Sequence, residues 1–460
     1  MTYPARFIER MTALCGDEWK SDPSAPPHRG VRVNTLKCAV PEFLELTDME
    51  LRPTPFAATG FELVRDHKAG ADPLHHAGAY YMQEPSAMSA VTALSLAPGE
   101  RVLDLCAAPG GKSTQIAAAI GREGLLFCNE YVRARAQVLL QNLERCGVTN
   151  AVVTSMDTAR LAERLPRFFD AVLADVPCSG EGMFRKEPAA LTEWSEDNIR
   201  LCAARGAAIL DAAAQTVRVG GLLLLSTCTF APEENECQAA AFLRRHPDFE
   251  LVSLDALPFG QPAFSWEQVK PFASGAPAPD ADLTRARRIF PKHGGEGHFL
   301  ALFRRTAGTE PDDGEPPRYA YPDDRAARDV TAALSEWFRT PPGGVPVRFG
   351  DLWRLLPPDL PDLKGLAVLH AGLAAAQVCK NRLEPTHALY AALGADAAQT
   401  VSLAPGDPRL TAFLRGEPVA VEPTVQGFTA VCVGDIPLGF GKASSGTLKN
   451  HYPKGLRLLG

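Results

Sequence analysis

The feature that most constrains the fold of this chain is an alternation of short apolar segments with helix-like segments between about residues 85 and 305. Strands that alternate with helices of about ten or more residues predict βαβ units and a parallel sheet covered on both faces. We therefore expect an α/β fold with a Rossmann-like sheet. Its strands are predicted in the segments RVLDLC, GLLFCNE, AVVTSMD, FDAVLADV and GLLLLSTC.

The carboxyl ends of these predicted strands carry polar side chains. In an open parallel sheet, ligands bind in the crevice outside the carboxyl ends of the strands, near the point where the strand order reverses. We expect the following carboxylates and cysteines to converge on one such crevice: Asp104, Glu130, Asp157, Asp175, Cys178 and Cys228.

The loop after the first predicted strand, VLDLCAAPGGKSTQ (residues 102–115), ends like a phosphate-binding P-loop. A P-loop needs a glycine where this chain has Cys106, so a P-loop NTPase is disfavoured. The dinucleotide motif G-x-G-x-x-G also fails, because only Gly110 and Gly111 are present. What remains is a tight strand-to-helix turn in which the missing Cβ atoms let a ligand approach the backbone.

Two acidic residues at the next strand ends favour an adenosyl cofactor at this turn. Glu130 could accept hydrogen bonds from a ribose diol, and Asp157, one strand further, could accept from an adenine amino group. This layout predicts an S-adenosylmethionine site. A glycine turn that only packs a helix on the sheet is the alternative for this segment taken alone.

The cysteines indicate a chemical role for two of them. The chain has 11 cysteines, an odd number, and no C-x-x-C pair, which favours reduced thiols over a disulfide framework or a zinc site. Cys178 and Cys228 differ from the others because they lie in turn sequence at the ligand-binding edge. A reactive thiolate needs partial exposure and nearby positive charge, which Lys112 could supply.

A cysteine beside a methyl donor indicates methylation of a pyrimidine at carbon 5. That carbon is too weak a nucleophile to be methylated directly, whereas addition of a thiolate to carbon 6 activates it. Asp175 could hydrogen-bond the N3/N4 edge of the base, and a base must later remove the proton from carbon 5. Both cysteines lie at strand ends, so the residues alone do not decide which one is the nucleophile.

Seven motifs, in the same order over about residues 30 to 305, resemble those of the Sun-type bacterial RNA (cytosine-5) methyltransferases, and among them the enzymes that act on ribosomal RNA. The motifs are VRVNTLK, QEPSAM, DLCAAPGGKSTQIA, NEYVRARAQVLLQNLERCG, DVPCSGEGMFRK, STCTFAPEENE and RIFPKHGGEGHFLALFRR. The resemblance implies a Rossmann-like methyltransferase sheet with a small N-terminal α/β module and a C-terminal PUA-like RNA-binding domain.

The resemblance also implies roles for individual residues. Cys228 would be the nucleophile, and Cys178 would assist proton removal and release of the methylated RNA. Asp175 and Lys112 complete the expected catalytic set through the contacts inferred above from the residues themselves. DNA cytosine-5 enzymes use the Pro-Cys cysteine instead, so the swapped assignment stays open. One departure is Gly297-His298-Phe299, where the family often has Gly-Phe-Phe, and we attach no functional doubt to it. The S-adenosylmethionine site would be lined by Cys106, Ala107, Ala108, Pro109, Gly110, Gly111 and Lys112, together with Glu130, Asp157 and Asp175.

The chain divides into four expected parts. Residues 306–324, rich in proline, glycine and acidic residues, are predicted to be a linker. Residues 86–305 would form the methyltransferase domain. Residues 1–85 would form a module that helps to hold RNA, with a structural cap on the sheet as the alternative. Residues 325–460 would form the PUA-like domain.

Contact with RNA must come from local patches, because the formal net charge of the chain is −7. In the acid-free segment 441–460, His451 and Tyr452 suit phosphate contact and base stacking, with a solvated lysine-rich tail as the alternative. The basic residues of that segment are Lys442, Lys449, Lys454 and Arg457. A second candidate patch holds Arg287, Arg288 and Lys292.

The expected function is S-adenosylmethionine-dependent methylation of carbon 5 of cytosine in ribosomal RNA, with 16S rRNA of the small ribosomal subunit as the expected target and partner. The alternatives are the same reaction on transfer RNA and a non-catalytic RNA-binding factor in ribosome assembly. The chain has no run of about 18 apolar residues and its start lacks the apolar core of a secretory signal. We therefore expect a cytoplasmic monomer that uses no metal and no membrane.

Overall fold

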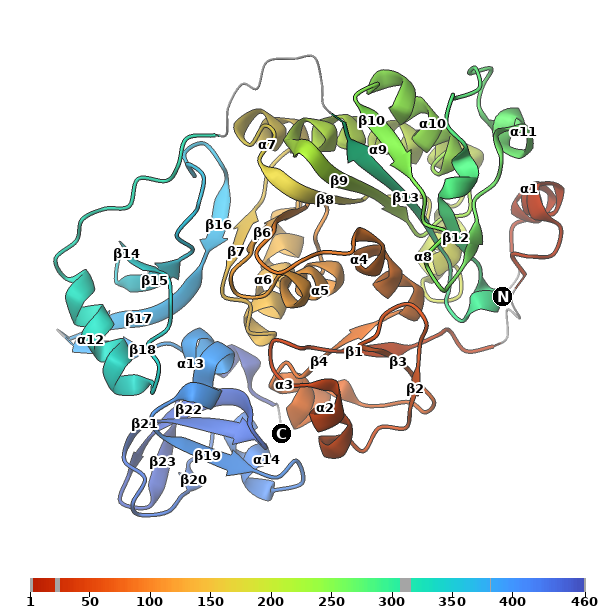
Figure 1. The fold of residues 1–460 in the computed structure, drawn as a ribbon. Coiled ribbons are helices and arrows are strands. Elements are labelled where there is room, and N and C mark those ends of the chain that lie inside the picture. The colour runs from red at the N-terminus through yellow and green to blue at the C-terminus, as the bar shows by residue number, and fades with distance from the viewer. Residues whose placement is uncertain (1–2, 21–24, 307–315, 381, 459–460) are drawn as a thin grey trace.

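The computed structural model describes residues 3–20, 25–306, 316–380 and 382–458 (Figure 1). Five parallel strands at its centre are β5 (Arg101–Asp104), β6 (Leu125–Asn129), β7 (Ala151–Thr154), β8 (Phe169–Asp175) and β9 (Val217–Thr227). Their order is β9-β8-β5-β6-β7, so the chain reverses its direction of travel at β5. These are the five strands predicted from the sequence, and the α/β fold is confirmed.

The parallel strands are apolar on both sides because helices cover both faces of the sheet (Figure 1). Side chains alternate along each strand, so in β5 Val102 packs on one face and Leu103 on the other. The first face is covered by α4 (Ser89–Leu94), α5 (Gly111–Ile120) and α6 (Arg133–Arg145). The second is covered by α7 (Thr158–Arg164), α9 (Glu196–Thr216) and α10 (Glu236–Arg245).

Antiparallel strands extend both edges of the parallel core to ten strands in all. Beside β9 these are β10 (Phe249–Val252), β11 (Gln261–Pro262), β12 (Arg287–Ile289) and β13 (His298–Arg305). Beside β7 lies β16 (Val368–Ala371), which comes from the C-terminal region. The C-terminal region therefore covers the β7 edge of the methyltransferase sheet, a pairing that the sequence reading did not predict.

The N-terminal part is a small α/β module, as expected. Its sheet has the order β2-β3-β1-β4 and is fully antiparallel. The strands are β1 (Gly30–Val33), β2 (Leu51–Pro53), β3 (Gly60–Leu63) and β4 (Tyr80–Gln83). Its helices are α2 (Val40–Leu46) and α3 (Pro73–His76). Helix α1 (Ala5–Cys15) packs instead on the methyltransferase domain, with Phe7 and Met11 in the core of that domain.

The C-terminal part contains two sheets. The first has the strands β14 (Val345–Phe349), β15 (Leu352–Leu356), β17 (Leu373–Cys379) and β18 (Arg382–Pro385), with α12 (Ala327–Trp337) and α13 (His387–Leu393). The second has β19 (Thr400–Leu403), β20 (Val419–Ala420), β21 (Gly427–Val433), β22 (Ile436–Ser444) and β23 (Thr447–Asn450), with α14 (Pro408–Leu414). Of the expected linker, residues 307–315 lie outside the described residues, and residues after 315 pack on this region, where Tyr319 N donates to Leu360 O at 2.9 Å.

The two ends of the chain share one hydrophobic core (Figure 1). Phe43 and Tyr80 of the N-terminal module belong to the same buried cluster as Leu410, Phe413 and Tyr452 of the second C-terminal sheet. This sets the N-terminal module between the methyltransferase domain and the C-terminal sheet. The described parts of the chain hold no helix that is long and apolar enough to cross a membrane.

The structure corrects two expectations about RNA contact. Arg287 and Arg288 are buried, and Arg288 forms an ion pair with the buried Glu236, so they do not form a surface patch. Tyr452 is 3% exposed and packs against Phe413, so it cannot stack on a base. Both errors have the same cause, since a basic or aromatic run in the sequence does not reveal which side chains the tertiary fold buries.

Candidate active site

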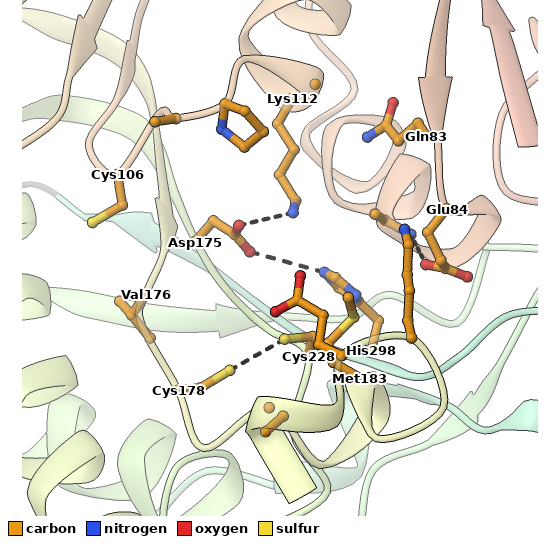
Figure 2. Close-up of a pocket in the computed structure, with 18 of the residues that line it drawn as sticks. Gln83, Glu84, Cys106, Lys112, Asp175, Val176, Cys178, Met183, Cys228 and His298 are labelled. Carbon is orange, nitrogen blue, oxygen red and sulfur yellow. Dashed lines mark hydrogen bonds and ion pairs between the residues drawn. The ribbon is translucent and has the colours of Figure 1, made fainter. Parts of the chain in front are cut away.

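A cavity of about 580 Å³ opens at the carboxyl ends of β5, β8 and β9, where the strand order reverses. The sequence-predicted residues that line it are Asp104, Cys106, Ala107, Ala108, Pro109, Gly111, Lys112, Asp175, Cys178 and Cys228. In Figure 2, Lys112 points toward Asp175 and Cys178 points toward Cys228, while the sulfur of Cys106 points away from these pairs. The expected crevice therefore exists and gathers most of the residues assigned to it.

The two cysteines lie side by side in this cavity. Strands β8 and β9 run in parallel register with Asp175 opposite Ser226, so the residues just beyond both strand ends are neighbours. The Sγ atoms of Cys178 and Cys228 are 3.4 Å apart, and both side chains are half-buried (Figure 2). The hydrogen bond to Cys228, together with burial, raises the pKa of Cys178 well above its ordinary value, so Cys178 is a neutral thiol at pH 7.

An ion pair stands beside the cysteines. Nζ of Lys112, on the first turn of α5, donates to Oδ2 of Asp175 at 2.8 Å. Burial acts to raise the pKa of Asp175, but the ammonium of Lys112, the nearby His298 and two hydrogen bonds outweigh burial and lower it. The same pairing raises the pKa of Lys112 against its burial. Both groups are therefore charged at neutral pH, and the lysine brings positive charge to the cavity that holds the thiols.

Two further polar side chains form a chain of hydrogen bonds that ends on the carboxylate oxygen of Asp175 that Lys112 does not contact. The Ser226 hydroxyl donates to Oδ1 of Asp175 at 2.8 Å, and Nε2 of His298 lies 2.8 Å from the same hydroxyl oxygen. Ser226 is the next-to-last residue of β9. His298 is the first residue of β13 and lines the cavity. Asp175 is thus held through both carboxylate oxygens.

The glycine turn brings backbone to the cavity, as expected from the sequence. Gly110 has φ of 111°, in the left-handed region, and α5 begins at the next residue. Asp104, at the end of β5, is buried; Ser113 Oγ donates to its Oδ2 at 2.7 Å, while its Oδ1 has no hydrogen-bond partner. Burial raises the pKa of Asp104 to about 7. An orphaned carboxylate oxygen in a cavity wall is suited to a ligand that brings a hydrogen-bond donor.

The N-terminal module forms part of the cavity wall. Tyr81, Gln83 and Glu84, at the end of β4, line the cavity, and Tyr81 and Gln83 lie directly against Gly111 of the glycine turn. The fully buried Arg32 of β1 connects the two, since its guanidinium donates to Gly111 O and to Thr114 Oγ1, both at 2.7 Å. The N-terminal module therefore supplies residues to the cavity wall and hydrogen bonds to the glycine turn, in addition to covering the sheet.

Comparison with known proteins agrees with this site. Four family models match consecutive parts of the chain: the N-terminal domain of 16S rRNA methyltransferase RsmF (residues 3–85), 16S rRNA methyltransferase RsmB/F (91–304), the RsmF rRNA methyltransferase first C-terminal domain (333–393) and the methyltransferase RsmF PUA domain (400–458). A ribosomal RNA small subunit methyltransferase F from Erwinia tasmaniensis is 33% identical over 99% of this chain and 96% of its own length. The chain belongs to the 16S rRNA methyltransferase RsmB/F family.

Solved structures show the same fold. A methyltransferase homologue from Pyrococcus horikoshii, 30% identical, covers 66% of this chain and 95% of its own, with a TM-score of 0.57. NSun6 from Pyrococcus horikoshii with SFG covers 66% of this chain and 99% of its own, with a TM-score of 0.54 at 20% identity. The predicted family, methyltransferase activity and PUA-like domain are confirmed, and the match to the PUA domain falls on the second C-terminal sheet.

Within this RsmB/F-family site, three of the expected cofactor residues do not line the cavity. Gly110 provides the left-handed backbone conformation of the turn but is not among the residues that line the cavity. Glu130 is buried, accepts from Val132 N at 2.9 Å and pairs with Arg135 at 3.2 Å. Asp157 is exposed and caps α7, with Ala159 N at 3.0 Å. The expected convergence of four carboxylates therefore holds for Asp104 and Asp175 only.

Sequence reasoning missed several residues that the structure places in the site. In the sequence, His298 stands out only as a departure from the family pattern, and Ser226 only as part of a motif. Both residues lie near Cys228 because β9 and β13 are neighbouring antiparallel strands. Recognising them from the sequence would have required knowing that these two strands pair. The same holds for Gln83 and Glu84, whose segment belongs to a different domain. In the part of the chain that the structure describes, no group of three or more His, Cys, Asp or Glu side chains could hold a metal ion.

Proposed function

We propose that this chain methylates carbon 5 of a cytosine in 16S rRNA through a covalent bond between Cys228 and carbon 6 of the base. The observation that carries the proposal is the pair of thiols at 3.4 Å beside the Lys112–Asp175 ion pair in one cavity. An enzyme that methylates an amine nitrogen needs neither thiol, whereas methylation at carbon 5 needs a nucleophile at carbon 6.

The reaction runs in three steps on the base. The Cys228 thiolate forms a bond to carbon 6, and the electron pair of the carbon 5–carbon 6 double bond makes carbon 5 a nucleophile. Carbon 5 takes the methyl group; a base then removes the proton of carbon 5, the double bond reforms and the sulfur–carbon 6 bond breaks. We assign Cys178, 3.4 Å from Cys228, to assist this proton removal and release. Once Cys228 is bonded to carbon 6 as a neutral thioether, the interaction with Cys228 that raises the pKa of Cys178 is lost. Asp175 accepts from the amino edge of the cytosine.

The residues around the glycine turn fit S-adenosylmethionine, which supplies the methyl group when bound. Asp104 lines the cavity and its buried Oδ1 has no hydrogen-bond partner, while the cofactor carries an ammonium group and ribose hydroxyls as donors. We assign Asp104 to the ammonium group, Glu130 to the ribose and Asp157 to the adenine. The turn itself, Cys106 through Lys112, would hold the cofactor together with Asp175.

The assignment of 16S rRNA as substrate rests on the family and on the outer parts of the molecule. The relatives are named small subunit methyltransferases, and the PUA domain lies at the C-terminus. Exposed lysines remain there for phosphate contact even though Tyr452 is buried: Lys442, Lys449 and Lys454. A ribosomal substrate places the reaction in the cytoplasm. We further propose that residues 1–85, 86–305 and 325–460 act as RNA-binding, catalytic and RNA-binding parts, joined by 306–324.

The proposal can be tested with labelled S-adenosylmethionine and three substrates: naked 16S rRNA, assembled small subunits and transfer RNA. We expect label in the first or second, and bisulfite mapping should place it at carbon 5 of a cytosine. Labelling of transfer RNA alone would overturn the choice of substrate, and no labelling of any RNA would favour a non-catalytic assembly factor.

The roles of the cysteines are tested by two alanine variants. Cys228→Ala should abolish methyl transfer but retain cofactor binding, because the nucleophile alone is lost. Cys178→Ala should instead accumulate a protein–RNA adduct that survives denaturing electrophoresis, because addition proceeds while release stalls. The reverse pattern would exchange the two roles and leave the reaction unchanged.

A further inference from the structure

A buried chain of hydrogen bonds ends on the carboxylate that we assign to the cytosine. It consists of His298, Ser226 and Asp175, and we call it the relay. Nε2 of His298 lies 2.8 Å from Ser226 Oγ, which lies 2.8 Å from Oδ1 of Asp175; the direct distance from Nε2 to Oδ1 is 3.9 Å. His298 is 3% exposed and Ser226 is fully buried, so bulk water does not compete for these bonds.

The protonation of the relay follows from its chemistry. Burial, with the nearby Lys112 ammonium, lowers the pKa of His298 to about 4, so the imidazole is neutral at pH 7 and carries one ring proton. An ionised carboxylate can only accept, so the single hydroxyl proton of Ser226 points to Asp175. The Ser226 oxygen must then accept from His298, which places the ring proton on Nε2. Nδ1 is left unprotonated, and it has no hydrogen-bond partner among the described residues.

We propose that His298 is a positioning residue which, through Ser226, holds the Asp175 carboxylate for the amino group of the target cytosine; this inference rests on the proposed function. Lys112 on one oxygen and Ser226 on the other fix the plane of the carboxylate. The remaining lone pairs can then accept from the exocyclic amino group. Uracil presents an oxygen at that position, which a fixed carboxylate repels.

Charged and titratable groups from other elements also face the relay, and the test must separate them from it. Lys112 of α5 contacts Asp175 directly, and Asp104 of β5 is close enough to be influenced by the charge of Asp175. Glu84, at the end of β4, acts to raise the pKa of His298, and Cys228 acts to raise the pKa of Lys112. None of these groups is altered in the variants below.

The first test replaces His298 by Phe, which keeps a ring of similar size without a donor. Without the fixed Ser226 hydroxyl, the pKa of Asp175 rises and the carboxylate protonates at higher pH. We expect kcat to fall about tenfold and the acid limb of the kcat profile to move up by about one pH unit. The KM for S-adenosylmethionine should stay the same. A His298→Phe enzyme with the wild-type profile would overturn the proposal.

A rescue and a double variant exclude a merely structural effect. His298→Gln places an amide nitrogen near the position of Nε2, so it should restore the donor to Ser226 and the wild-type profile. Ser226→Ala should reproduce the loss, and His298→Phe in that background should add nothing further. Additive losses, or a Gln variant as impaired as the Phe variant, would show that His298 acts through packing alone.

A matched control lies outside the cavity. His246, after α10, also has an Nε2 atom 2.8 Å from an aspartate oxygen, that of Asp211. His246→Phe removes the same kind of bond and should leave kcat and its pH profile unchanged. A shift equal to that of His298→Phe would assign the effect to general destabilisation.

A measurement without turnover separates failure of this inference from failure of the proposed function. In protein labelled with ¹⁵N-histidine, the resonance lost in His298→Gln should show a neutral ring protonated on Nε2, and Ser226→Ala should change its shifts. A ring protonated on Nδ1 overturns the relay even if the enzyme is active. A wild-type chain that methylates no RNA overturns the proposed function, and with it the role of the relay in the reaction, whatever the tautomer.

Discussion

The polar side chains at the strand ends of one sheet fall into two groups, one that lines the cavity and one that bonds to backbone amides. At the ends of β8 and β9, Asp175, Cys178 and Cys228 line the cavity, and their partners are side chains. At the ends of β6 and β7, Glu130 and Asp157 accept from backbone amides at the start of the following helix. The comparison teaches that polar residues occur at all of these strand ends, while nearby backbone amides decide which carboxylates bond to the following helix and do not line the cavity.

The strongest way to break this comparison is to remove one carboxylate from each group. Asp175→Asn keeps the shape of the side chain but loses the charge that pairs with Lys112 and accepts from the base. We expect kcat to fall about a hundredfold. Glu130→Gln should leave kcat within about twofold and raise the KM for S-adenosylmethionine. Steady-state kinetics with 16S rRNA measure both; equal losses of kcat would mean that the two strand ends share one role.

Asp104 belongs to the cavity group and gives a pH dependence of smaller size. Its pKa is raised to about 7 by burial, so below pH 7 the free protein holds this carboxyl protonated. A cationic ammonium group binds the ionised form better, so the Kd for S-adenosylmethionine should rise as pH falls, by up to about tenfold per pH unit. Calorimetric titration between pH 8 and 5.5 checks this.

Asp104→Asn is the matched variant for that titration. Its side chain cannot ionise, so its Kd should be weak and nearly independent of pH over the same range. A wild-type Kd that is equally flat would remove Asp104 from the cofactor site.

Asp157 tests the other side of the comparison, with the smallest expected effect. As the cap of α7 it accepts from Ala159 N, so Asp157→Ala should lower the free energy of unfolding by about 1 kcal/mol. Asp157→Asn, which also caps well, should restore most of that stability. Urea unfolding followed by circular dichroism measures both. If the alanine variant binds S-adenosylmethionine normally, the residue is a cap only and its assignment to adenine is wrong.

The fold was largely predictable because its signals are local. The five parallel strands are near-continuous apolar runs, and each is followed by a turn or a helix with its own sequence pattern. The glycine turn and the two cysteines lie next to those runs, so the order of elements was enough to place them at one edge. Burial of Arg287 and Arg288 was not predictable in this way, since Arg288 pairs with Glu236 and packs on Phe264, and Arg287 donates to Leu254 O, all on other elements.

The site was predictable only where it consists of strand ends. Ser226 and His298 join the site because β13 pairs antiparallel with β9, and Gln83 joins because the N-terminal module docks on the glycine turn through Arg32. Contacts of this kind join residues far apart in the chain. No spacing in the sequence records them.

The sequence by itself determined the α/β class, the glycine turn, the two candidate thiols and Asp175, because each follows from the residues next to it. Only the tertiary structure decided that the N- and C-terminal parts share a core, that the sulfurs of Cys178 and Cys228 lie side by side, and that His298 reaches Asp175 through Ser226. The physical reason is that burial and hydrogen-bond partners set the protonation and orientation of a side chain. Both are supplied by segments that meet only after the chain has folded.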